Sequence, residues 1–306
     1  MKEIVEIVRE WRKRPSETFA LATLVRVGGS SYRRPGARML ISNDGGMVGS
    51  LSGGCLEEEV ALLAQDVMRN DRAKLVPFDL RRRFGCNGQI EIFIERPEKK
   101  FFFDLAEHID LRRSCVASTN FEDTSRSLGT RIIGTREESN AGDFIQQIDP
   151  PIQLVIIGGG HDTIPFRALS DLLGWTLLEI ENISELPGNL DSWSAAVVKT
   201  HNYGRDFSAL RMLVPLGLRY LGLIGPRRRR DQLLADLFDV TGPIDAELFS
   251  PAGLDLGGET PQEIAFAIVA EIQSIFAAAS CESLRNRKTP IHAISYDLPE
   301  ALRATR

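Results

Sequence analysis

The sequence has little that would suit a membrane, a disulfide framework or a structural zinc site. Its 306 residues contain no apolar run of about 18 residues, the length that a membrane-spanning helix needs. The four cysteines are widely spaced and include no Cys-x-x-Cys pair, so neither a zinc ribbon nor a dense disulfide scaffold is indicated. The opening stretch, MKEIVEIVREWRKR, lacks the apolar core of a secretion signal. These absences predict a cytoplasmic protein with no membrane span.

The sequence also lacks an excess of positive charge. It has 37 lysines and arginines against 42 aspartates and glutamates, with a formal net charge of -5 at pH 7. General binders of nucleic acid or of a membrane surface are basic, so no nucleic-acid partner is expected and any anion site must be local. With 43% apolar residues, the chain is long enough for two domains with their own cores.

The first half predicts a mixed α/β domain. Its apolar patterns indicate strands at 20–27, 37–42, 47–51, 75–80 and 89–95, and helices at 2–14, 56–68 and 99–112. Shorter strands are expected near Cys115 and Arg131. The following segment, TREESNAGDFIQQIDPP at 135–151, is polar and ends in two prolines, and we interpret it as a domain boundary.

The second half predicts a Rossmann-like, doubly wound parallel sheet. The apolar runs LVIIGG, WTLLEI, AAVVKT and RYLGLIG alternate with helical segments, as buried parallel strands do. A last helix at 261–278 is signalled by Thr260 as its cap and Glu263 as the partner in a capping box. The predicted organisation is an N-terminal α/β domain with a connecting segment at 1–148, a Rossmann-like domain at 149–284 and a tail at 285–306.

The turn GGGH at 158–161 follows a strand and opens a helix, the setting in which glycines bring backbone N–H groups close to a phosphate. The full G-x-G-x-x-G pattern is incomplete, because Thr163 stands at the third glycine position. Glu179 and Glu181 end the next strand, where one of them is placed to bind a ribose hydroxyl. Two interpretations remain: a site for a nucleotide or phosphate, or a turn that needs glycine for packing alone.

Two loops of the first half carry candidate donors and thiols. In SLSGGCLEEEV at 50–60, Ser52 is the expected helix cap, and Cys55 would be a soft ligand, a reactive thiol or a small buried residue. In GSSYRRPGARM at 29–39, serines and arginines offer donors for an anion, unless the loop is simply a solvated surface. Cys86, in FGCNGQ, is a second candidate for the functional thiol.

Further candidates follow strands of the second half, at the edge where open parallel sheets bind ligands. His201, in KTHNYGRD, would bind an anion, move a proton or act only as a structural hydrogen-bonder. Gly225 ends a strand just before the arginine run 227–230. Asp255 and Glu259, in GLDLGGETPQE, are either turn and capping residues or ligands for a metal or a hydroxyl.

Taken together, these motifs resemble the XdhC/CoxI family of molybdenum-hydroxylase maturation factors. The matching stretches are GSSYRRPGARM, GSLSGGCLEEEV, VIIGGGH, VVKTHNYGRD, YLGLIGPRRR and GLDLGGETPQEIAFAIVAEI. The resemblance implies that the chain binds the molybdenum cofactor (molybdopterin), protects its sulfurated form and delivers it to a xanthine dehydrogenase-type or CO dehydrogenase-type hydroxylase. It also implies a cysteine desulfurase as a partner. A homodimer is the default expectation for a soluble oligomer.

The sequence departs from the family pattern at the second Rossmann strand, which ends in Leu178-Glu179-Ile180-Glu181-Asn182, and after His161. We therefore expect a carrier and no catalytic residues, with a cleft between the domains shared by Cys55 and Gly160. Cys55 is the expected contact to molybdenum or its sulfur, and a nucleotide is a further candidate ligand at the Rossmann site. The alternative is an NAD(P)-dependent oxidoreductase or a nucleotide-processing enzyme. The expected cofactor contacts are Ser30, Ser31, Arg38, Gly53, Gly54, Cys55, Gly158, Gly160, His161, His201, Gly225, Asp255 and Glu259.

Overall fold

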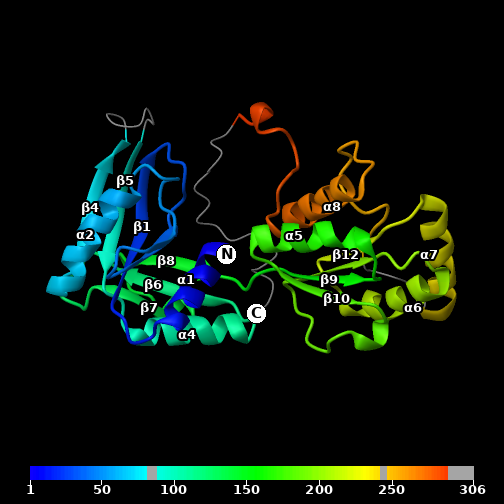
Figure 1. Cartoon of the computed structure of the whole chain (residues 1–306), viewed down its shortest axis with the longest axis horizontal. Coiled ribbons are helices and arrows are strands. Elements are labelled where there is room, and N and C mark those ends of the chain that lie inside the picture. Colours follow the sequence, from blue (N-terminus) through cyan, green and yellow to red (C-terminus); the bar gives the residue numbers. More distant parts are fainter. Residues whose placement is uncertain (81–87, 242–246, 289–306) are drawn as a thin grey trace.

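The computed structural model describes residues 1–80, 88–241 and 247–288, which form two α/β lobes side by side (Figure 1). The first lobe is built on an antiparallel five-stranded sheet in the order β3-β2-β1-β5-β4. Its strands are β1 (Phe19–Gly29), β2 (Arg38–Ser42), β3 (Met47–Gly49), β4 (Lys74–Asp79) and β5 (Gly88–Glu95). The expected strands of this sheet are therefore all present, and Cys86 lies outside the described residues.

Alternate residues along a strand point to opposite sides of a sheet, so each face of this sheet presents its own set of side chains. Both faces are covered by helices. On one face, Ala20, Ala22 and Leu24 pack in a core with the helix α2 (Glu57–Asn70). On the other face, Phe19 and Leu21 pack with α1 (Lys2–Lys13) and α4 (Lys99–Asp110). Trp11 of α1 stacks on Phe102 of α4 with ring centroids 5.3 Å apart, which fixes the two helices to each other.

A second, three-stranded sheet completes the first lobe. Its order is β7-β6-β8, with β6 at Cys115–Asn120, β7 at Gly129–Ile133 and β8 at Phe144–Ile148. The polar segment 135–151, interpreted above as a domain boundary, contains β8, and its two prolines lie between β8 and the first strand of the second lobe. The strand FIQQI has too little apolar alternation to be recognised alone, and its pairing along β6 defines it.

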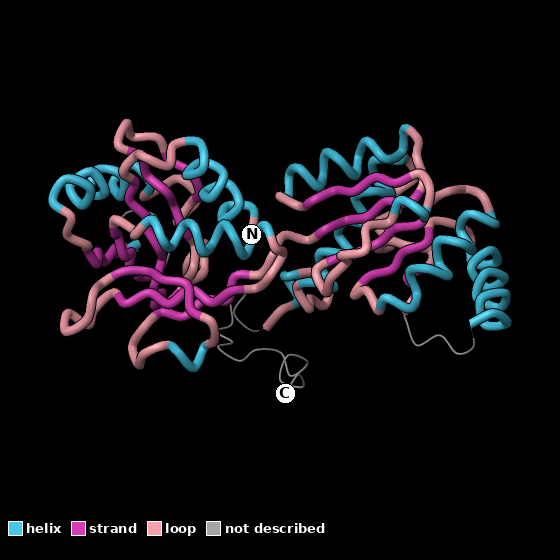
Figure 2. Tube along the Cα trace, turned by 90° about the horizontal axis from the view of Figure 1, so that it is seen from below, coloured by secondary structure: helices cyan, strands magenta, loops and turns pink. Residues whose placement is uncertain are grey.

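The second lobe is a parallel five-stranded sheet in the order β10-β9-β11-β12-β13, as predicted. The strands are β9 (Gln153–Ile157), β10 (Thr176–Ile180), β11 (Ser194–Val198), β12 (Tyr220–Leu223) and β13 (Leu248–Phe249). Helices α6 (Tyr203–Leu213) and α7 (Arg227–Thr241) pack on one face, and α5 (Ile164–Leu173) and α8 (Pro261–Phe276) on the other. Figure 2 shows helices on both sides of these strands. The predicted capping box of α8 is formed by Thr260 and Glu263.

The first lobe contacts the second lobe at the edge of the parallel sheet where the amino ends of β9–β13 lie. We name this edge the amino edge. Arg112, two residues after the end of α4, donates to both Asp191 carboxylate oxygens at 2.8 and 3.0 Å and to the Trp193 carbonyl at 3.3 Å, just before β11. Lys2 Nζ donates to the Leu172 carbonyl near the end of α5, 3.1 Å away. Helices α6 and α7, which follow the carboxyl ends of β11 and β12, lie at the far right of Figure 1. The opposite side of the sheet, the carboxyl edge, therefore faces away from the first lobe.

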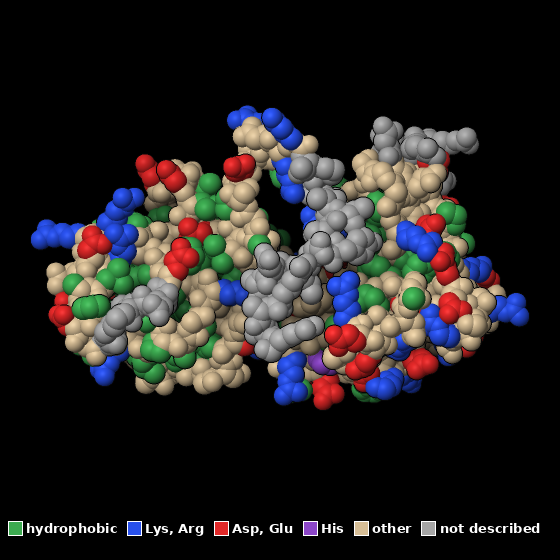
Figure 3. All heavy atoms as spheres, turned by 180° about the vertical axis from the view of Figure 1, so that it is seen from behind, with side chains coloured by type: hydrophobic (Ala, Val, Ile, Leu, Met, Phe, Trp, Pro, Cys, Tyr) green, Lys and Arg blue, Asp and Glu red, His purple; other side chains and the backbone are tan. Residues whose placement is uncertain are grey.

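Acidic and basic side chains are interspersed over both lobes on the face drawn in Figure 3. Within the described ranges, no helix combines the length and the apolar character that crossing a membrane requires.

Candidate functional site

The loop between β3 and α2 is organised around the carboxylate of Glu57. Six hydrogen bonds of 2.6–3.0 Å reach this carboxylate, three on each oxygen. The donors are the hydroxyls of Ser50 and Ser52 and the backbone N–H groups of Leu51, Ser52, Gly54 and Leu56. A carboxylate has about four lone-pair positions, so its capacity to accept is filled. Loop 50–56 is therefore an anion-binding loop whose donors already bind the carboxylate of Glu57.

The environment of Glu57 keeps it ionised. Burial opposes ionisation of the Glu57 carboxyl, but the hydroxyl and amide donors outweigh burial and hold its pKa well below the usual range. The expected role of Ser52 as the cap of α2 is wrong in detail, because Leu56 takes the cap position. The Ser52 hydroxyl instead accepts from the N–H groups of Cys55 and Leu56, each 3.1 Å away, within the turn before the helix.

Cys55 is exposed, which rules out the interpretation that it is a small buried residue. It stands directly after Gly53 and Gly54, whose φ angles of 87° and 115° favour glycine. The exposed ring of Tyr32 lies against this loop, since a Cβ added to Gly53 would be 3.1 Å from the Tyr32 ring. Loop 29–37, which also carries the exposed Ser30 and the half-buried Ser31, thus adjoins loop 50–56.

Arg38 does not belong to this surface. The side chain is 1% exposed on β2, and its guanidinium donates to the Gln146 side chain of β8. Burial lowers the pKa of Arg38 to about 10, although the nearby Glu95 carboxyl acts in the opposite direction. Arg38 therefore links the two sheets through Gln146, and the structure gives it no surface from which to bind a cofactor.

The glycine turn lies at the carboxyl edge, and the carboxylate of Asp162 lies beside Gly160. Lys199, fully buried after β11, donates from Nζ to Asp162 Oδ1 at 2.7 Å and to the Gly159 carbonyl at 3.1 Å. Gly158 and Gly160 have φ angles of 114° and 126°, and a Cβ on Gly158 would lie 2.7 Å from the Lys199 carbonyl oxygen. Burial opposes ionisation of Asp162, but the bond from Lys199 outweighs it, so the pKa of Asp162 is lowered.

The two histidines of the predicted site flank this turn. His201 Nε2 is 3.6 Å from Asp162 Oδ2, and His201 has a left-handed φ of 54° that a non-glycine residue seldom adopts. His161 is exposed in the 3-10 turn that precedes α5. Behind His201, the buried Asp206 accepts from the Thr200 backbone and hydroxyl and pairs with Arg229. These contacts fix loop 199–202 beside the glycines.

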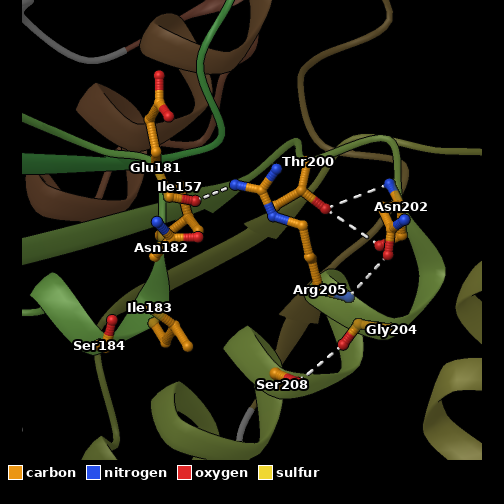
Figure 4. Close-up of a pocket in the computed structure, with 10 residues that line it drawn as sticks. All are labelled: Ile157, Glu181, Asn182, Ile183, Ser184, Thr200, Asn202, Gly204, Arg205 and Ser208. Atoms are coloured by element: carbon orange, nitrogen blue, oxygen red, sulfur yellow. Dashed lines mark hydrogen bonds between the residues drawn. The ribbon is translucent and has the colours of Figure 1, made fainter.

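A pocket of about 430 Å³ opens next to the turn (Figure 4). Residues 181–184 after β10 form one side, and residues 200–208 at the start of α6 form the other. The Arg205 side chain extends from α6 and donates to the Glu181 carbonyl. Glu179, the other acidic candidate, is engaged by Arg167 at 2.5 Å and does not line the pocket.

The remaining candidates lie in loops of the second lobe. Gly225 follows β12 and is half-buried, while Asp255 and Glu259 are exposed in the loop before α8. The backbone N–H of Glu259 donates to Glu263, which makes this loop part of the helix cap. Over the residues that the structure describes, no group of three or more His, Cys, Asp and Glu side chains is arranged to hold a metal ion.

The structure brings the predicted residues together in two groups and not in one. Ser30, Ser31 and the loop 53–55 belong to the first lobe, which contacts the amino edge of the second. The glycine turn and His201 lie at the carboxyl edge, beyond the five residues of β9, a length of roughly 16 Å. The expected cleft shared by Cys55 and Gly160 is therefore wrong for a single chain.

Three residues at these sites escape prediction from the sequence: Glu57, Asp162 and Lys199. A carboxylate that directly follows a loop rich in serine and glycine is the available signal for Glu57. For Lys199 the sequence offers no such signal, because it only follows an apolar strand. Asp162 directly follows the GGGH turn, and an acidic residue at a helix start is its signal.

Comparisons with known proteins agree with these two lobes. The sequence model of the XdhC and CoxI family matches residues 13–79, and the model of the XdhC Rossmann domain matches residues 154–272. The chain belongs to the XdhC and CoxI family.

Its relatives include a protein of Bacillus subtilis named as a probable xanthine dehydrogenase subunit, 28% identical over 84% of this chain and 92% of the relative. They also include the molybdenum cofactor insertion chaperone PaoD of Escherichia coli, 22% identical over 83% of this chain and 82% of the relative. A crystal structure described as a xanthine dehydrogenase from Bacillus halodurans shares the fold, with a TM-score of 0.77 at 24% identity, over 95% of this chain and 98% of that one.

Proposed function

We propose that this protein is a maturation factor that carries the molybdenum cofactor and inserts it into a molybdenum hydroxylase. The observation that carries the proposal is an exposed thiol, Cys55, on a loop whose shape is fixed by the Glu57 carboxylate. A thiolate is a soft metal ligand, so Cys55 suits a contact to molybdenum or to its sulfur ligand. The name of the Escherichia coli relative PaoD, a molybdenum cofactor insertion chaperone, supports the same role, and the Bacillus subtilis relative is named for a xanthine dehydrogenase.

The cofactor is cargo, and the first lobe would hold it. Loop 50–56 contributes the thiol, but its serine hydroxyls are used by Glu57 and are not available to an anionic group of the pterin. Ser30 and Ser31, in the adjoining loop, are the donors that stay at the surface. The proposal includes protection of the sulfurated form, a cysteine desulfurase as the sulfur donor, a homodimer and a cytoplasmic location.

The test is anaerobic binding of molybdopterin by Cys55→Ser and, as a matched control, Cys281→Ser. Both cysteines are exposed, and the bond from residue 55 to Ser52 comes from its backbone N–H, so neither substitution should disturb the fold. We expect near-stoichiometric binding by the wild type and by the control, and at least about tenfold weaker binding by Cys55→Ser, as measured by mass spectrometry of the bound molecule. Equal binding by all three proteins would show that Cys55 does not contact the cargo.

An NAD(P)-dependent oxidoreductase has less support. Thr163 stands at the third glycine position of the dinucleotide pattern, and the Asp162 carboxylate, paired with Lys199, lies near Gly160, where a pyrophosphate at the helix start would be repelled. We expect no saturable change in fluorescence when NADH or NADPH is titrated into the protein, and tight saturable binding would restore the enzymatic alternative.

A further inference from the structure

Tyr32 holds an aromatic ring in solvent beside loop 50–56. At 72% exposed, it is the most exposed aromatic side chain among the residues that the structure describes. A tyrosine ring is a large apolar surface, and leaving it in water forgoes the free energy that its burial would provide. Most of this ring is therefore open to a ligand, and the surroundings of the ring indicate which kind of ligand fits.

Loop 50–56 bounds the ring on one side. Gly53 lies against it, since a Cβ added there would be 3.1 Å from Tyr32 Cε1 and 3.2 Å from Tyr32 Cδ1. Cys55 follows two residues later and is also exposed, so the ring and the thiol belong to the same part of the surface. Backbone N–H groups of the loop donate to Glu57, which fixes the place of the thiol relative to the ring.

An ion pair anchors the loop that carries the ring. Arg33, the next residue, donates from Nη1 to Glu3 Oε1 of α1 at 2.7 Å, and each side chain of the pair is only 28% exposed. The hydrogen bond to Glu3 raises the pKa of Arg33 against the effect of burial, and Tyr32 and Glu57 add to the rise, which places both near the guanidinium. The ring is thus held in place before any ligand binds, so binding costs little conformational freedom.

The organic part of the proposed cargo matches an exposed tyrosine ring. A pterin is a flat, heteroaromatic ring system, and such rings stack on aromatic side chains as nucleobases do. Ser30 and Ser31, the two preceding residues, keep their side chains at the surface, and the polar edge of a pterin offers acceptors for their hydroxyls. The loop therefore supplies both a face for stacking and donors for the edge of the same ring.

We infer that Tyr32 recognises the pterin ring of the cargo by stacking on it, while Cys55 contacts the metal end of the same molecule. The inference rests on the proposed function and divides the work of the site between two residues. The thiol acts only on forms of the cofactor that carry the metal. The ring acts on every form that contains the pterin, so the protein also binds the pterin without its metal.

The experiment measures anaerobic binding of two ligands to the full chain, the molybdenum cofactor and the same pterin without its metal, by mass spectrometry of the bound molecule over a range of concentrations. Tyr32→Leu should bind both ligands about tenfold more weakly, because a stacked ring is lost. Cys55→Ser should bind only the metal-bearing ligand more weakly. Tyr32→Phe keeps the ring and should bind both ligands within about threefold of the wild type.

Tyr203→Leu is the matched control, because Tyr203 is an exposed tyrosine of the second lobe and its loss should leave both affinities unchanged. Hydrogen exchange of the Gly54 and Leu56 amides should be the same in Tyr32→Leu as in the wild type, which separates loss of the ring from loss of the loop's shape.

The inference is overturned if the wild type does not bind the metal-free pterin, or if Tyr32→Leu binds it as tightly as the wild type. It is also overturned if Tyr32→Phe loses as much affinity as Tyr32→Leu, or if the loop amides exchange faster in Tyr32→Leu. In each of these cases the wild type can still bind the molybdenum cofactor, so the proposed function stands. A wild type that binds neither ligand would overturn the proposed function together with the inference.

Discussion

Replacing Glu57 by glutamine tests whether one carboxylate holds the thiol-bearing loop. Glutamine keeps the shape of the side chain but has a single acceptor oxygen, so its NH2 group would face three of the six donors that now bond the carboxylate. At about 1 kcal/mol for each lost bond, the first lobe should lose about 3 kcal/mol of its free energy of unfolding.

The assay is hydrogen exchange of the amides that now donate to Glu57, together with the rate at which N-ethylmaleimide modifies Cys55. In Glu57→Gln the amides of Leu51, Gly54 and Leu56 should exchange faster, and the modification rate should change because the loop no longer has one shape. Glu58→Gln is the matched control, because Glu58 is the exposed neighbour with the same charge. Equal exchange in the two variants, with a change in stability below about 0.5 kcal/mol, would refute the reasoning.

The contribution of Glu57 should also depend on pH in a defined direction. Its pKa is lower in the folded protein than the value of about 4.3 in an unfolded chain, so its stabilisation is fully present above that value. It decreases as the pH falls below that value and is gone once the pH is below the lower, folded-state pKa. The difference in stability between the wild type and Glu57→Gln should therefore be constant from about pH 7 to about pH 5 and shrink in more acidic solution.

Three further changes have expected outcomes. Gly160→Ala should destabilise the second lobe by about 1–3 kcal/mol in urea unfolding, because alanine is strained at a φ of 126°, whereas Gly188→Ala, in open space, should change little. Lys199→Met should lower the melting temperature in calorimetry by the equivalent of about 2 kcal/mol, since Asp162 loses its buried partner; an unchanged melting temperature would contradict this. Arg112→Ala should increase the radius of gyration in solution scattering by loosening the contact between the lobes, an effect that the exposed neighbour Arg113→Ala should not produce.

The regular elements are predictable because their signals are local. The Rossmann strands are continuous apolar runs. The start of α8 is indicated by Thr260 and Glu263, three residues apart, which form its capping box. The strand β8 is not predictable in this way, because its identity depends on pairing with β6. Arg38 is misjudged from the sequence for a similar reason, since its partner Gln146 is 108 residues away in the chain.

The candidate site is only partly predictable. The serines and glycines of loop 50–56 are typical of a loop with donors for an anion, but the pattern does not say which anion fills it. Glu57 looks like an ordinary acidic residue in the first turn of a helix, and Asp162 looks like a departure from a motif. The relative position of the two loops depends on Arg112 and Lys2, which no motif includes.

The attachment of the first lobe to the amino edge has a consequence for how partners can bind. A protein that approaches Cys55 and a protein that approaches the glycine turn come from different directions, because the length of the parallel strands separates the two places. A partner bound over the glycine turn would therefore leave the thiol-bearing loop open to a second protein.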